Sequence, residues 1–147
     1  MPDGILPNEG IADQLVYLVQ SPIAGVLESQ CRLWVNDFTP DKDTVLADLQ
    51  EATFSGYVRK TVPRADWQTP TVTDGCATSV NGTMPLQWTV TAATTEKVYG
   101  YALVDVLAGV IRFVQRLEPD DIQPLAVGNV LKLLPQYTLT SAACPGA

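Results

Sequence analysis

The stretch from Cys31 to Tyr57, CRLWVNDFTPDKDTVLADLQEATFSGY, constrains the fold more than any other part of the chain. Its first residues alternate between apolar and other side chains, which is the period of a half-buried strand; the apolar set is Cys31, Leu33 and Val35. Pro40 ends this strand, because proline fixes its own φ and donates no backbone hydrogen bond. The stretch therefore predicts a strand and a turn, followed by further structure up to Gly56.

A short inserted helix is expected after the turn. Asp43 or Thr44 is suited to cap it, since both side chains accept hydrogen bonds from the first backbone amides of a helix. An apolar stripe follows at helical spacing, formed by Val45, Leu46 and Leu49. Tyr57 then begins extended structure again.

A second helix is expected near the N-terminus, over residues 8–20. Asn8 can cap it, and Ser21-Pro22 ends it. Its apolar residues fall at i, i+4 and i+7, and we take them as candidate interface residues: Ile11, Leu15 and Leu18. This segment either packs on the following domain or docks on a neighbour. We therefore divide the chain into an N-terminal arm, 1–22, and a β domain, 23–147.

The rest of the chain shows the two-residue period and the turn signals of short strands. Asp74-Gly75 and Asn81-Gly82 are strong turn signals. The segments 98–104 and 110–117 are expected to form a hairpin. Further strands are expected over 57–62, 71–73, 86–90, 129–134 and 136–141.

The predicted fold is mostly β, an antiparallel β-sandwich or barrel-like domain of about eight strands. A length of 147 residues fits one domain, and 46% hydrophobic with 17% charged residues fits a folded chain. The apolar side of each element predicts the core, which comprises Leu33, Val35, Leu46, Trp88, Val90, Leu103, Ile111 and Phe113.

Several kinds of function are disfavoured by composition. The formal net charge is −7, which opposes neutralisation of nucleic-acid phosphates, although Arg59, Lys60 and Arg64 form a small basic cluster. The chain has no histidine, which excludes histidine-based triads and the usual zinc sites. No apolar run is long enough for a membrane span, and the N-terminus lacks the basic region of a signal peptide.

No metal, cofactor or catalytic residue is expected. The acidic pairs Asp41/Asp43 and Asp120/Asp121 lack the spacing of a calcium loop and are expected to be solvated turns. Asn81-Gly82-Thr83 matches a glycosylation sequon but is expected to be a turn.

The three cysteines cannot all pair within one chain. Cys31 lies in an apolar strand pattern and is expected to be a buried free thiol. A disulfide between Cys76 and Cys144 is possible, but no feature of the sequence supports it. The count fits a chain made in reducing cytoplasm.

The three tryptophans leave a sugar platform open as an alternative. Trp88 alternates with aliphatic residues and is expected in the core. Trp34 either joins such a platform or packs under the following helix. Trp67 lies among polar residues and is our candidate for an exposed interface contact.

Two segments carry a resemblance to a known group. The residues VNDFTPDKDTVLADLQEATFSGY, the later Trp67, and the pair YGYALVD and GVIRFVQRLE resemble a recurrent small protein of tailed bacteriophages and related prophages. The match covers Leu33 to Tyr57 and Tyr99 to Leu117. The resemblance implies a virion protein without catalytic residues, made in the host cytoplasm.

Within that group, the function we expect is a capsid decoration or cement protein. Its partners would be the major capsid protein and further copies of itself, with a homotrimer suited to three-fold points of a shell. A phage tail or baseplate component is the alternative in the same class. A carbohydrate-binding module is the alternative from another class.

Overall fold

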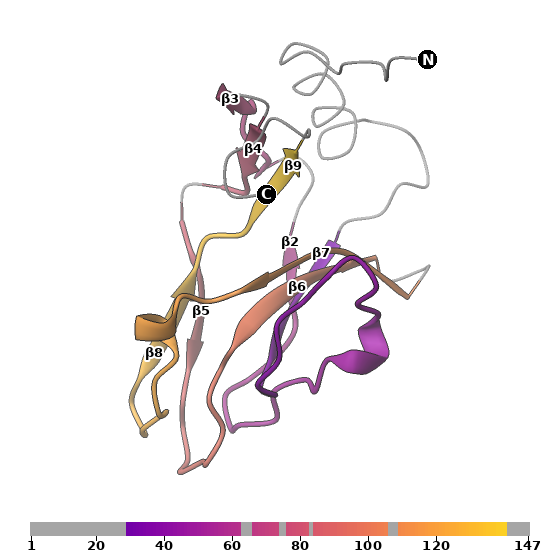
Figure 1. The fold of residues 1–147 in the computed structure, drawn as a ribbon. Helices are drawn as coiled ribbons and strands as arrows, with labels where there is room; N and C mark the ends of the chain where they lie inside the picture. The colour runs from indigo at the N-terminus through magenta and orange to yellow at the C-terminus, as the bar shows by residue number, and fades with distance from the viewer. Residues whose placement is uncertain (1–28, 63–65, 74–75, 83, 106–108, 141–147) are drawn as a thin grey trace, which may run out of the picture. The chain divides into compact units, whose positions relative to one another are not determined.

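The computed structural model describes residues 29–62, 66–73, 76–82, 84–105 and 109–140 (Figure 1). These residues fall into two compact units. The larger unit is built from residues 29–62 and 85–133, and the smaller unit from residues 66–84 and 134–140. The predicted N-terminal helix, and with it the boundary after residue 22, lies outside the described residues and stays a prediction.

The described structure is mostly β, as expected, and its sheets are antiparallel and open. One sheet of the larger unit has the order β2-β1-β6-β7 and a second pairs β5 with β8. The bounds in the larger unit are β1 Ser29–Trp34, η1 Leu46–Asp48, β2 Lys60–Val62, β5 Leu86–Thr89, β6 Gly100–Asp105, β7 Val110–Arg116, η3 Pro119–Asp121 and β8 Val130–Leu133. No closed barrel is present among these strands.

Strand β6 lies at the centre of the four-stranded sheet and is buried along its whole length. Its residues Tyr101 and Leu103 stand opposite Leu33 and Cys31 of β1, so these four side chains share one face. Strands β5 and β8 cover that face, because Leu33 and Tyr101 line a cavity of about 50 Å³ together with Trp88, Leu131 and Leu133. Side chains of both sheets therefore meet around this cavity.

The opposite face of this sheet carries Trp34 and Gly100, which stand opposite one another. A Cβ atom at position 100 would overlap the Trp34 ring and the Gln115 carbonyl oxygen, so only glycine leaves room for the indole. The chain between β1 and β2 returns to the sheet at this end. The Val35 amide donates to the Gln50 carbonyl oxygen (2.8 Å), and the Ala52 amide donates to that of Leu33 (3.0 Å).

The inserted helix is shorter than expected. The chain forms a single 3-10 turn, η1, which follows Val45 and is not capped by Asp43 or Thr44. The Asp41 carboxylate instead accepts bonds from the Asp43 amide and the Thr44 hydroxyl. Because residues 50–52 are already bonded to β1, the segment has no room for a second helical turn, and such short helices are marginal in any case.

The hairpin of β6 and β7 forms as predicted, but its register contains a bulge. Leu103 stands opposite Phe113 and Val104 opposite Ile111, so Arg112 is an extra residue in β7. Strand β7 is also an edge of the sheet among the described strands. Ile111 and Phe113 are therefore half-buried, and their assignment to the core was wrong. Val35 and Leu46 are half-buried too, whereas Leu33, Trp88, Val90 and Leu103 are buried as predicted.

The described residues of the smaller unit form one sheet with the order β3-β4-β9. Its strands are β3 Thr71–Thr73, β4 Cys76–Val80 and β9 Gln136–Thr140. Asp74-Gly75 joins β3 to β4, which pair as expected for this turn signal. Asn81-Gly82 does not make a hairpin, because β4 pairs with β9 whereas β5 pairs with β8. Cys76 is disulfide-bonded, while Cys31 of the larger unit is a buried free thiol.

Candidate functional site

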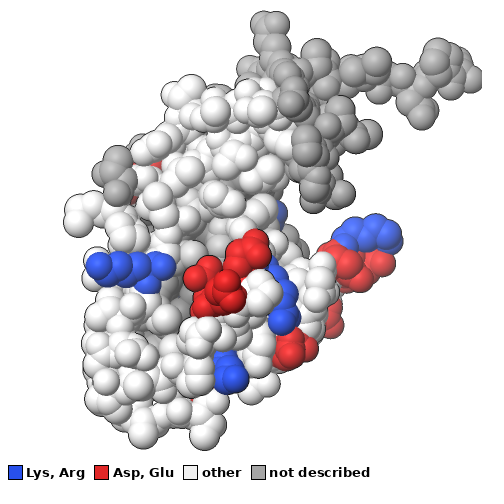
Figure 2. All heavy atoms as spheres, turned by 60° about the vertical axis from the view of Figure 1, so that its left-hand side comes forward, with Lys and Arg blue, Asp and Glu red and all other residues white. Residues whose placement is uncertain are grey.

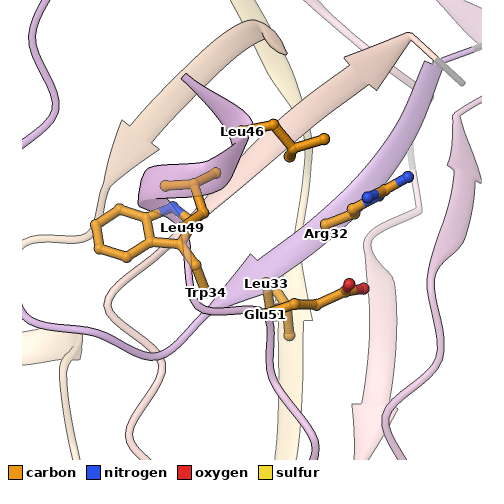
Figure 3. A pocket seen from close by; sticks show the side chains of 6 residues that line it. All are labelled: Arg32, Leu33, Trp34, Leu46, Leu49 and Glu51. Atoms are coloured by element: carbon orange, nitrogen blue, oxygen red, sulfur yellow. The ribbon is translucent and has the colours of Figure 1, made fainter. Parts of the chain in front are cut away.

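A hollow of about 150 Å³ lies between β1 and η1 in the larger unit (Figure 3). Its lining combines apolar and charged side chains, namely Arg32, Leu33, Trp34, Leu46, Leu49 and Glu51. Leu46 and Leu49 come from the η1 segment and lie above the strand (Figure 3). Leu33 and Trp34 are buried, whereas Leu46 and Leu49 are half-buried.

The two charged residues of the hollow differ in their partners. Glu51 accepts two hydrogen bonds from Arg59, at 2.7 and 2.8 Å, and a third from the Tyr57 hydroxyl at 2.8 Å. Arg32 donates from Nε to the side-chain oxygen of Gln30 at 3.1 Å. Thus the carboxylate is already neutralised within the protein. Among the described residues, the Arg32 guanidinium has the Gln30 amide oxygen as its one hydrogen-bond acceptor, and it interacts with Glu51 through charge alone.

These contacts shift the ionisation of the groups around the hollow. The hydrogen bond from Arg59 holds the pKa of Glu51 below its usual range, although partial burial acts in the opposite direction. Burial and the bond to Glu51 raise the pKa of Tyr57, so this phenol stays protonated. Its hydroxyl also accepts a bond from the Leu33 amide at 3.3 Å. The network is structural, since every polar group in it is engaged by another.

Trp34 forms one wall of the hollow and packs against two other aromatic rings. Its ring centre lies 4.8 Å from that of Phe38 and 6.5 Å from that of Tyr99, to which it is stacked. Its indole Nε1 is buried and has no hydrogen-bond partner among the described residues. The nitrogen lies on the edge of the ring next to Leu49 (Figure 3). Trp34 therefore packs under the inserted segment, which was one of its two predicted roles.

A second cluster fixes the start of the same segment. Arg116, at the end of β7, donates to the Phe38 carbonyl oxygen at 2.6 Å and to the Asp37 carboxylate at 2.7 Å. Its guanidinium carbon lies 5.3 Å from the centre of the Tyr99 ring. No local pattern in the sequence indicates this contact, because it joins residues nearly eighty positions apart.

Trp67 is buried, with an exposed fraction of 5%, so the expectation of an exposed interface contact was wrong at this position. It forms an isolated bridge with Asn81. Trp34 and Trp88 are 1% and 2% exposed. All three tryptophans of the chain are thus buried, which removes the aromatic platform of the carbohydrate alternative. The remaining candidate interface residues, Ile11, Leu15 and Leu18, lie outside the described residues.

Charged groups of opposite sign lie close together on the face shown in Figure 2, and wide areas around them carry no charge. Lys42 pairs with Asp43, and Arg112 with the buried carboxylate of Asp105. Asp120 and Asp121 lie in the exposed turn η3. Within the described ranges, no group of three or more acidic, histidine or cysteine side chains is placed to hold a metal ion. No helix among those residues is long and apolar enough to cross a membrane.

The chain was compared with models of protein families, with curated proteins and with solved structures, and none of them matches it.

Proposed function

We propose that this chain is a structural protein of a tailed-bacteriophage or prophage particle, which binds the outside of the capsid as a decoration or cement protein. One observation carries the proposal. The two segments that resemble such proteins, Leu33 to Tyr57 and Tyr99 to Leu117, pack on one another through Trp34, Tyr99 and Arg116. Their distinctive residues thus hold an inserted segment on a sheet, which is the role expected of scaffold residues in a structural protein.

The proposed mechanism is mass action. A protein that binds the assembled shell but not its separated subunits stabilises the shell by the free energy of that binding. The uncharged areas on the face shown in Figure 2 support a contact of this kind, since the centres of protein interfaces are poor in charge. The excess of acidic residues would then keep the decorated particle soluble.

Two finer features belong to the same proposal. The facing sheets of the larger unit are proposed to be the core of a β-sandwich, since one cavity is lined from both. A closed homotrimer is proposed as the form that binds, because trimers match local three-fold points on a shell. Native mass spectrometry at micromolar concentration, with and without shells, tests the trimer, and a species that stays monomeric in both would contradict it.

Binding to particles is the direct test of the function. Purified chain is mixed with mature capsids lacking tails, with isolated tails and with empty buffer, and each is sedimented through a density gradient. We expect the chain to co-sediment with capsids in stoichiometric amount and to raise the temperature at which they release DNA. Co-sedimentation with tails alone would replace the capsid proposal by a tail or baseplate component, and binding to neither would refute both.

The predicted arm, 1–22, can be tested in the same assay. Deleting it should weaken binding to capsids while the β domain keeps its circular-dichroism spectrum, because a terminal segment is free to become ordered on a neighbour. Unchanged binding of the truncated chain would show that the contact lies elsewhere.

A further inference from the structure

The hollow between β1 and η1 is large enough for a small ligand. A cavity of about 150 Å³ is the size that holds one benzene molecule, so this hollow fits roughly six to eight non-hydrogen atoms. Trp34, Leu46 and Leu49 supply apolar walls, and the two leucines are half-buried. The size and the apolar walls of the hollow therefore suit a short branched aliphatic group.

The charges at the hollow select the other end of such a ligand. Arg59, Arg112 and Arg116 each form an ion pair with a carboxylate. Among the arginines of the described ranges, Arg32 is the exception, and its Nε is bonded to the amide oxygen of Gln30. Arg32 thus lacks the carboxylate partner that the other three arginines have. A carboxylate would fit it, because the guanidinium fork matches a carboxylate in geometry as well as in charge.

Glu51 also lines the hollow and has to be weighed against Arg32. An acidic residue alone would favour a cationic ligand. However, Arg59 already neutralises Glu51 through two hydrogen bonds, and Tyr57 occupies a further position on the same carboxylate. Arg32 acts on Glu51 only through their opposite charges and is hydrogen-bonded to no carboxylate, so among the residues that line the hollow it is the charged group left to hold an anion.

We propose that this hollow binds a short aliphatic carboxylate, with the branched carbon chain against Leu46, Leu49 and Trp34 and the carboxylate on Arg32. Two sources share this chemistry: a free branched-chain acid, and the C-terminal residue of a peptide that ends in leucine or a similar side chain. This proposal about the ligand does not depend on the proposed role of the chain in a virion.

The test is a titration of the full chain, labelled with ¹⁵N, followed by the resonances of Arg32 Nε–H and the Trp34 indole N–H. The probes are 4-methylpentanoate, its uncharged amide 4-methylpentanamide, N-acetyl-leucine and N-acetyl-leucinamide. The carboxylates should bind at least roughly tenfold more tightly than their matched amides, as expected for one charge-assisted contact. Tighter binding of N-acetyl-leucine than of 4-methylpentanoate would assign the site to peptide C-termini, and the reverse to free acids.

Two variants separate the charge from the apolar walls. Arg32→Gln should reduce carboxylate affinity by at least roughly tenfold and bring it to that of the amide. Lys97→Gln, which removes an exposed cation that does not line the hollow, should leave the affinity unchanged. The proposal is overturned if acid and amide bind equally to the native chain, if both variants bind alike, or if no resonance moves up to about 20 mM ligand. The comparison of acid with amide needs no variant, so a folding defect in Arg32→Gln would not obscure the outcome.

Discussion

The two units of this chain are stabilised in different ways. In the larger unit, β6 is buried throughout and large side chains such as Trp34, Trp88 and Leu103 fill its surroundings. In the smaller unit, the buried side chains include the polar Ser79 and Asn81 beside Trp67 and the small Ala77. The Ser79 hydroxyl donates to the Gln68 carbonyl oxygen at 2.6 Å, and the Asn81 amide donates to that of Pro135 at 2.8 Å.

Among the described residues the larger unit has six strands and the smaller unit has three. A three-stranded sheet buries little apolar area, so hydrogen bonds and a cross-link have to replace part of the hydrophobic contribution. The disulfide of Cys76 lies in the smaller unit, whereas the larger unit keeps Cys31 as a free thiol. Burial raises the pKa of Cys31 to about 12, so this thiol is inert in the folded chain and acts as a small apolar side chain.

The largest effect is expected from truncating the core of the larger unit. Trp88→Ala removes a ring that is 2% exposed and also the bond from its Nε1 to the Val58 carbonyl oxygen. The free energy of unfolding should fall by about 3–5 kcal/mol, as for other buried aromatic residues. Urea denaturation measures it. Val127→Ala, at a position 60% exposed in the same unit, is the control and should change stability by less than about 0.5 kcal/mol.

Removing the cross-link should give the next largest effect, confined to the smaller unit. Cys76→Ser should cost about 2–4 kcal/mol locally, so that amides of β4 and β9 exchange faster while those of β6 keep their protection. Hydrogen exchange measured by mass spectrometry distinguishes the two units. Equal acceleration in β6 would show that the units unfold together and that their separate stabilisation is wrong.

The partner of Cys76 is itself a prediction. Since Cys31 is free, a bond within one chain leaves Cys144, which lies outside the described residues. Peptide mapping without reductant should recover Cys76 linked to Cys144 and Cys31 unmodified by iodoacetamide until the chain is unfolded. A covalent dimer on a non-reducing gel would show instead that the bond joins two copies.

The sequence predicted the strands well because their apolar period and their turn residues are local. Strand β3 was predicted at its observed bounds, and the hairpin of β6 and β7 within two residues. The predictions were wrong where contacts between distant parts of the chain determine the structure. The bulge at Arg112 and the edge position of β7 left Phe113 half-buried, and the bonding of residues 50–52 to β1 reduced the expected helix to one turn.

The candidate site could be predicted only in part. The alternation in β1 correctly placed Arg32 and Trp34 on the face opposite Leu33. It gave no sign that Leu46 and Leu49 would close over them, or that Arg59 would neutralise Glu51. Trp67 was misjudged because its neighbours in sequence are polar, whereas its burial depends on its bridge to Asn81 and on other tertiary contacts.

A smaller effect on stability is expected at Gly100, where the segment Leu33 to Tyr57 packs on the segment Tyr99 to Leu117. Gly100→Ala would place a Cβ atom against Trp34 and the Gln115 carbonyl oxygen, and should cost about 1–3 kcal/mol through overpacking. Near-ultraviolet circular dichroism should also change, because Trp34 and Tyr99 must shift. Gly109→Ala is a useful contrast, since its Cβ meets nothing within 4 Å and only its positive φ of 66° opposes the substitution. It should lower stability by about 1 kcal/mol without altering the aromatic signal.

The smallest effect concerns the pH dependence of the pair beside the hollow. The pKa of Glu51 is lowered in the folded chain, chiefly by the bond from Arg59, so the ionised carboxylate favours folding. This contribution is complete above the ordinary carboxyl value of 4.5 and is lost as the pH falls through the lowered folded value. Because Arg59 is 46% exposed, solvent screening limits the pair to about 0.5 kcal/mol.

The stability difference between the native chain and Glu51→Gln should therefore be small but constant near neutrality and should shrink in acid. Glu118→Gln, at an exposed glutamate outside the network, is the control. A difference that grows in acid would contradict this prediction. It would mean that folding favours protonated Glu51, and that Glu51 is not an ionised partner of Arg59.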